Sequence, residues 1–131
     1  MIEPIWPDPQ ALLDDLAEYM AEEGQTLQLT RRDDFLAGLD RARAALGYQP
    51  DATLAHLAAL IFDGIATRHP LVDGNKRLAW LSAVSFLILN GIHLDAPERA
   101  SYDIGMAVIA KTRTVADLAA FFTEFAIEIE D

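Results

Sequence analysis

The sequence predicts an all-α fold, a compact single-domain bundle of about six helices. Three observations predict it. Apolar residues recur at three- and four-residue intervals in successive segments, and Pro, Gly and Asp residues separate these segments. The chain has 131 residues, the length of one domain, so we assign residues 1–131 to a single domain. It has no cysteine, which excludes a disulfide scaffold.

The first two predicted helices lie on either side of a segment that fits two structures. The first helix has Asp8 as its N-cap and Pro9 at its first position, and its apolar repeat runs up to Gly24. Residues 25–30 alternate weakly between polar and apolar side chains, which fits either a short strand or an extended connection. The second helix is predicted over residues 31–46, with a glycine as its stop.

The third and fourth predicted helices flank a turn that contains proline and glycine. Thr53 is the expected N-cap of the third helix, which must end before His69 because Pro70 disfavours the α conformation there. The fourth helix starts within residues 74–77 and runs to Gly91. Apolar residues cover most of its circumference, which is typical of a helix at the centre of a bundle.

Two amphipathic helices complete the predicted bundle. They cover residues 97–111 and residues 115–129. Thr114 is the expected N-cap of the last helix, and Asp117 three positions later makes a short relative of the capping box.

Charge and composition exclude several functional classes. The chain carries 21 acidic and 10 basic side chains, a formal net charge of −11, so it lacks the basic footprint needed to track nucleic acid or anionic lipid. The absence of cysteine excludes a thiolate zinc site and a cysteine nucleophile. The sequence shows no membrane span and no signal peptide. We therefore expect a cytoplasmic protein without direct contact to nucleic acid or membrane, in which any anion site is local.

One short stretch concentrates residue types that can do chemistry. It is residues 69–77, His-Pro-Leu-Val-Asp-Gly-Asn-Lys-Arg, which we call the signature segment. A helix N-terminus binds phosphate through its unpaired N–H groups, and Gly74 lets the backbone approach an anion closely. Lys76 and Arg77 add positive charge, and Asp73 can hold a Mg²⁺ ion that bridges nucleotide phosphates. The imidazole of His69 can act as a general base near neutral pH.

Ordinary capping and turn roles at a helix start account for the same residues. Asp73 can be an N-cap, Gly74 and Asn75 a turn, and Lys76 and Arg77 the exposed start of a helix. Spacing alone leaves both interpretations open.

The signature segment resembles that of the Fic/Doc family, in which a His, an aromatic or aliphatic position, an acidic residue and Gly-Asn or Ala-Asn precede a short basic run. It is most similar to the Doc branch, the death-on-curing toxins, which have Asn-Lys-Arg. The Fic branch has Gly-Asn-Gly-Arg and a second arginine three positions later, where this chain has Lys76 and Trp80. Leu71 and Leu78 replace the phenylalanine and threonine common in Doc-like sequences, and both changes affect packing. The likeness covers residues 31–95, whereas residues 1–30 match weakly.

This resemblance implies a small helical bundle and a protein kinase. Doc toxins transfer the γ-phosphate of ATP to a threonine of elongation factor Tu and so stop translation, and a Phd-type antitoxin bound in a groove neutralises them. The implied roles are a base that activates the target hydroxyl for His69 and a Mg²⁺ ligand for Asp73. The implied phosphate-binding nest consists of Gly74, Asn75, Lys76 and Arg77.

Two other functions stay open. The same segment can transfer an adenylyl or other nucleotidyl group, or the chain can be a catalytically silent helical module that docks a partner. A metal-dependent phosphohydrolase of the HD type is disfavoured because no histidine is followed by aspartate, and a Walker loop is absent because Arg77 follows Lys76. His56 and His93 lack ligand partners at metal spacing, so we expect surface or core roles for them.

Overall fold

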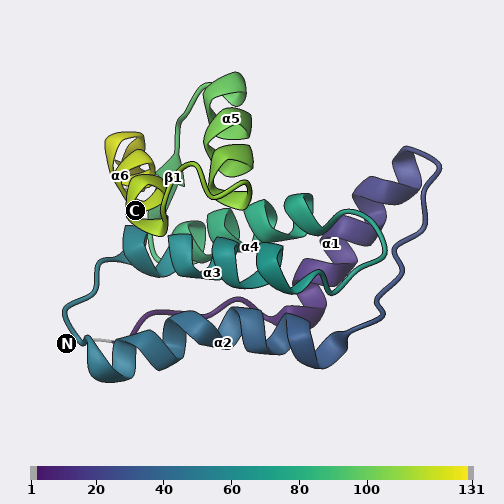
Figure 1. The fold of residues 1–131 in the computed structure, drawn as a ribbon, viewed down its shortest axis with the longest axis horizontal. Helices are drawn as coiled ribbons and strands as arrows, with labels where there is room; N and C mark the ends of the chain where they lie inside the picture. The colour runs from purple at the N-terminus through teal and green to yellow at the C-terminus, as the bar shows by residue number, and fades with distance from the viewer. Residues whose placement is uncertain (1–2, 130–131) are drawn as a thin grey trace.

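The computed structural model describes residues 3–129 and confirms the predicted all-α fold (Figure 1). Six helices and two short strands occur within this range, in the order α1 (Pro9–Glu22), α2 (Arg32–Tyr48), α3 (Leu54–Arg68), α4 (Asn75–Leu89), β1 (Ile92–Leu94), α5 (Glu98–Ile109), α6 (Val115–Glu124) and β2 (Ala126–Glu128). None of the helices in the described part of the chain is long and apolar enough to cross a membrane.

Three helices begin at the N-caps that the sequence predicts. The side chain of Asp8 accepts a hydrogen bond from the Ala11 N–H (3.1 Å), and that of Thr53 accepts one from the His56 N–H (3.1 Å). Thr114 and Asp117 form a reciprocal capping box at the start of α6. These polar side chains satisfy N–H groups that a helix start leaves without partners, which fixes where α1, α3 and α6 begin.

Two predicted helix ends were wrong. Gly47 does not stop α2, which runs through it to Tyr48. The last helix ends at Glu124, and Ala126–Glu128 instead form strand β2, which pairs antiparallel with Ile92–Leu94. The backbone groups of this segment gain hydrogen-bond partners in β1, an arrangement that local spacing does not reveal.

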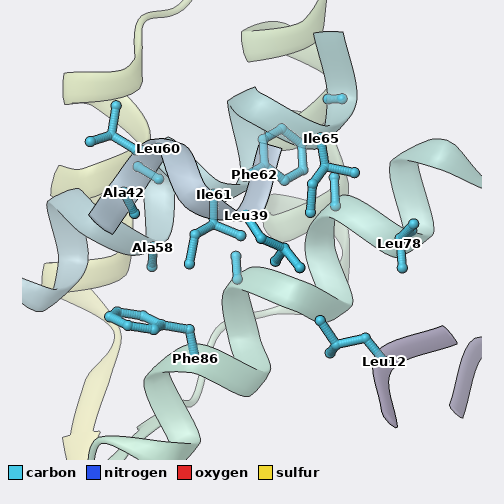
Figure 2. Close-up of a cluster of buried hydrophobic side chains, with 14 of the residues drawn as sticks. Leu12, Leu39, Ala42, Ala58, Leu60, Ile61, Phe62, Ile65, Leu78 and Phe86 are labelled. Carbon is cyan, nitrogen blue, oxygen red and sulfur yellow. The ribbon is translucent and has the colours of Figure 1, made fainter. Parts of the chain in front are cut away.

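Helix α3 is at the centre of the bundle. Figure 1 shows it between α2 on one side and α5 and α6 on the other, and α4 also packs against it. Apolar side chains of α2, α3 and α4, including Leu39, Ile61 and Phe86, turn toward one another and make a continuous core (Figure 2). The sequence placed α4 at the centre, and α4 does bury much of its surface, but Ile88 and Leu89 near its end are exposed.

Two glycines set the close approach of α2 and α3. A Cβ atom added to Gly64 would lie 2.7 Å from the Gly38 carbonyl oxygen, and one added to Gly38 would lie 3.0 Å from the Gly64 backbone. The helices therefore touch backbone to backbone at this crossing. An ion pair between Arg41 and Asp63 links the same two helices.

Candidate active site

The signature segment leaves α3 through a left-handed residue. Helix α3 ends at Arg68, as predicted, and His69 has φ 49° and ψ 60°. A residue directly before a proline favours an extended backbone, and His69 precedes Pro70. Its left-handed conformation therefore departs from this local rule. Non-glycine residues with positive φ are uncommon and tend to occur at functional sites. The His69 side chain is exposed.

Backbone hydrogen bonds hold the signature segment against the connection that follows α1. The carbonyl oxygen of Pro70 accepts from the N–H groups of Thr30 (3.0 Å) and Arg31 (3.1 Å), and the Val72 N–H donates to the Gln28 carbonyl (3.1 Å). A single antiparallel bridge joins residues 29 and 71. Residues 25–30, which fitted either a strand or a connection, thus form an extended connection with one bridge.

The side-chain amide of Asn75 fixes the shape of the loop from inside. Its Oδ1 accepts from the Leu71 N–H (2.8 Å), and its Nδ2 donates to the Leu71 carbonyl (2.9 Å). Leu71 itself is buried. The amide group is therefore occupied by the protein backbone, which leaves the Asn75 N–H at the helix start as the group of this residue that can face an anion.

Helix α4 begins without a side-chain cap among the described residues. Gly74 is its N-cap, with φ 91° and ψ 12°, and the Asp73 Oδ1 accepts from the Gly74 N–H (2.9 Å). Asp73 is therefore not the N-cap of α4, which corrects the capping role that the sequence left open for it. The helices α2 and α5 also lack a side-chain cap, but both carry acidic residues in the first turn.

The first turn of α4 carries positive charge instead. It has no acidic residue, and it contains Lys76 and Arg77. Cations at the positive end of a helix dipole are unfavourable for the helix alone, whereas the same arrangement favours a bound anion. The exposed side chains of Lys76 and Arg77 and the uncapped helix start thus concentrate positive charge at one place on an acidic protein.

All six predicted site residues line one cleft of about 680 Å³. They are His69, Asp73, Gly74, Asn75, Lys76 and Arg77. The end of α1, helix α3 and helix α5 complete its walls, and the apolar part of the lining includes Phe62, Trp80 and Met106. His56 and His93 do not line this cleft.

Comparison with known proteins decides the family. The family model described as the Fic/DOC family matches residues 9–87, from the start of α1 nearly to the end of α4. The chain belongs to the Fic/DOC family. A stretch of 39 residues is also 51% identical to a protein named Toxin Doc from Mycolicibacterium smegmatis. That match spans 30% of this chain and 30% of the length of the relative.

The family match extends further toward the N-terminus than the sequence resemblance indicated. It includes α1 and the connection over residues 25–30, which the resemblance covered only weakly. In the structure these parts border the same cleft as the signature segment, because Tyr19, Met20 and Gln25 line it. This Fic/DOC chain therefore builds its cleft from the matched region together with α5, which follows it.

Two aromatic side chains that line the cleft, Tyr19 and Trp80, each contact another residue of the lining. Arg77 lies over the ring of Tyr19, with 4.1 Å between its Cζ and the ring centroid, and a hydrogen bond with the Glu23 carboxylate raises the pKa of Tyr19. Sequence reasoning did not identify Tyr19 or Glu23 as site residues, since nothing local marks them. Trp80 packs edge-on against Phe62, with ring centroids 5.9 Å apart.

Asp73 fits a magnesium ion only in the company of a nucleotide. Its carboxylate is exposed at the cleft, and residues 3–129 contain no group of three His, Asp or Glu side chains arranged to hold a metal. Mg²⁺ in nucleotide sites takes one or two carboxylates together with phosphate oxygens and water. The donor set of this Fic/DOC chain suits that kind of shared coordination.

Proposed function

We propose that this chain is a Doc-type toxin that acts as a protein kinase. In this proposal it transfers the γ-phosphate of ATP to a threonine hydroxyl of a translation factor, with elongation factor Tu as the expected target, and thereby inhibits translation. The family membership and the 51% identity to Toxin Doc over 39 residues support it. The Asn-Lys-Arg sequence at residues 75–77 adds support, because it is the form that resembles the Doc branch.

The observation that carries the proposal is the start of α4. An uncapped helix N-terminus, Lys76 and Arg77 provide positive charge in the cleft that His69 and Asp73 also line. Phosphoryl transfer needs little covalent chemistry from the protein, since it relies on in-line positioning and on neutralising the phosphate charge. A sparse site of this kind is sufficient for it.

The proposed reaction assigns one task to each group. The bond between the γ-phosphorus and the β–γ bridging oxygen of ATP breaks, so that ADP leaves, and a bond between that phosphorus and the target hydroxyl oxygen forms. His69 accepts the hydroxyl proton as general base. Asp73 would hold Mg²⁺, which neutralises phosphate charge when bound. The backbone N–H groups at the start of α4, together with Lys76 and Arg77, would bind the phosphate oxygens.

Lys76 favours transfer of the γ-phosphate over transfer of the nucleotide. The nucleotidyl-transferring Fic branch has a glycine at this position, where backbone can approach the α-phosphate. The Lys76 side chain lines the cleft and occupies space there. A nucleotide bound in the reverse orientation, with its γ-phosphate toward His69, avoids that crowding. Nucleotidyl transfer by the same segment is the second candidate function.

The experiment compares two forms of ATP that carry the label on different phosphates. The purified chain is incubated with a bacterial translation extract and ATP labelled at either the γ- or the α-phosphate, and labelled proteins are separated and identified. We expect label from the γ position on one translation factor and none from the α position. Label from the α position alone would overturn the kinase proposal in favour of nucleotidyl transfer, and no label from either would overturn both.

We also propose an antitoxin of the Phd type as partner. A toxin in a toxin–antitoxin module requires a neutralising protein, and a disordered antitoxin segment can fold on an apolar surface as it binds. The net charge of −11 favours basic segments in that partner or in the target. Complexes of this chain with either protein should therefore weaken as the salt concentration rises.

A further inference from the structure

Arg77 differs from the arginines that form ion pairs in the described part of the chain. Four ion pairs occur there, and they involve Arg31, Arg41, Arg43 and Arg99 with aspartate partners. Arg77 is in none of them. Its guanidinium carbon instead lies 4.1 Å from the centroid of the Tyr19 ring, which comes from the last turns of α1.

The type of contact matters for what Arg77 can bind. A carboxylate partner would accept from the N–H groups of the guanidinium edge, which are the groups that recognise phosphate as a fork. An aromatic ring attracts the cation through its face and takes up none of these donors in a conventional hydrogen bond. The Tyr19 ring therefore restrains the Arg77 side chain while its phosphate-binding edge stays available.

The ring is itself held in place relative to the signature segment. Tyr19 lies in the last turn of α1. The neighbouring Met20 is buried, and its sulfur would lie 3.5 Å from a Cβ atom added to Gly74. The end of α1 thus packs closely on the N-cap of α4. This packing fixes the backbone that carries Tyr19 next to the start of α4.

We propose that Tyr19 is a positioning residue, which orders the Arg77 guanidinium at the cleft wall for contact with a nucleotide phosphate. This inference rests on the proposed function and extends it to a residue of α1 outside the signature segment. An unrestrained arginine loses side-chain freedom when it binds phosphate, and an arginine already restrained by a ring loses less. Loss of the ring should therefore weaken nucleotide binding through Arg77.

The test uses Tyr19→Leu, Tyr19→Phe, Arg77→Ala and the double variant Tyr19→Leu/Arg77→Ala. Tyr48→Leu is the matched control, because Tyr48 is 80% exposed near the end of α2 and does not line the cleft. Two quantities are measured on each protein. One is the NMR resonance of the Arg77 Nε–H group, identified by its disappearance in Arg77→Ala, and the other is the Kd for ATP with Mg²⁺ by calorimetry.

We expect Tyr19→Leu to shift the Arg77 resonance toward the value of a free arginine and to weaken ATP binding about two- to tenfold, the cost of immobilising one long side chain on binding. Tyr19→Phe keeps the ring and should stay close to the unaltered chain in both measurements. The double variant should bind ATP no more weakly than Arg77→Ala, and Tyr48→Leu should change nothing.

Two results would overturn the inference. One is an unchanged Arg77 resonance in Tyr19→Leu, and the other is a Tyr19→Leu effect on ATP binding that persists in full when Arg77 is already alanine. Failure of the proposed function appears differently, as an absence of ATP binding by the unaltered chain. In that case Arg77 does not bind a nucleotide phosphate either. The NMR measurement still decides whether Tyr19 orders the Arg77 guanidinium.

Discussion

The side-chain amide of Asn75 is bonded in both directions to the backbone of Leu71, four residues earlier. The Leu71 N–H donates to Oδ1 over 2.8 Å, and Nδ2 donates to the Leu71 carbonyl over 2.9 Å. This pair closes the turn between α3 and α4 and aims the uncapped start of α4 at the cleft. Asn75 thus acts on the site through the shape of the loop.

Removing this amide should damage both the fold and the proposed activity. Asn75→Ala leaves two partly buried backbone groups of Leu71 without partners, at a cost of about 1–3 kcal/mol in the free energy of unfolding. Denaturant unfolding and label transfer from ATP check the two effects. Asn90→Ala is the matched control, because the Asn90 amide bridges the backbone of Ile5 in the same way, away from the cleft. It should lower stability alone, and an equal loss of activity in both variants would contradict the role given to Asn75.

Gly74 should be needed for binding as well as for backbone conformation. Its φ of 91° strains any residue with a Cβ atom, so Gly74→Ala should lower stability by about 1–2 kcal/mol. Gly24→Ala is the control, since Gly24 has a φ of 74° and nothing within 4 Å of an added Cβ atom. Both variants should lose similar stability in thermal unfolding, while only Gly74→Ala should weaken ATP binding. Equal ATP affinity in the two variants would argue against an anion site at the start of α4.

The crossing of α2 and α3 gives a prediction about stability alone. Gly64→Ala places a methyl group 2.7 Å from the Gly38 carbonyl oxygen, so we expect overpacking that destabilises the protein by about 1–3 kcal/mol. Gly47→Ala adds a methyl group where nothing lies within 4 Å, inside α2, and should stabilise by roughly 0.5–1 kcal/mol. Urea unfolding of the two variants measures both shifts. Shifts of the same sign would refute the backbone-to-backbone packing.

The capping box of α6 should make stability depend on acid pH. Hydrogen bonds from Thr114, first from its backbone N–H, hold the pKa of the Asp117 carboxyl below its usual range. A lowered pKa in the folded state contributes stability that is present above the unfolded value, about 4, and is lost as the pH falls through the folded value. The advantage of the unaltered chain over Asp117→Asn in urea unfolding should therefore shrink below about pH 4. A constant difference across that range would contradict the assignment.

Local sequence signals predicted the features whose causes are local. The N-caps Asp8, Thr53 and Thr114 each satisfy the N–H group three residues later, so sequence alone reveals them. The six predicted site residues lie within one short segment, so the sequence alone places them close together. The left-handed conformation of His69 was not predictable, because a residue directly before a proline favours an extended backbone.

Contacts between distant residues account for what the sequence did not predict. Strand β2 exists because β1, more than thirty residues earlier, offers it a partner. The bond from the Val72 N–H to the Gln28 carbonyl and the stacking of Arg77 on Tyr19 likewise join separate segments. No periodicity or capping signal encodes such pairs, and only the packing of α1 against α4 brings Tyr19 to the site.

The most direct test of the account is the rate of label transfer from γ-labelled ATP by His69→Ala. His93→Ala is measured beside it, since His93 lies on β1 outside the cleft. Loss of a general base should lower the rate about 10²- to 10⁴-fold in His69→Ala, while His93→Ala keeps the rate of the unaltered chain. A His69→Ala protein that is folded and transfers the γ-label at the unaltered rate would contradict the proposed mechanism.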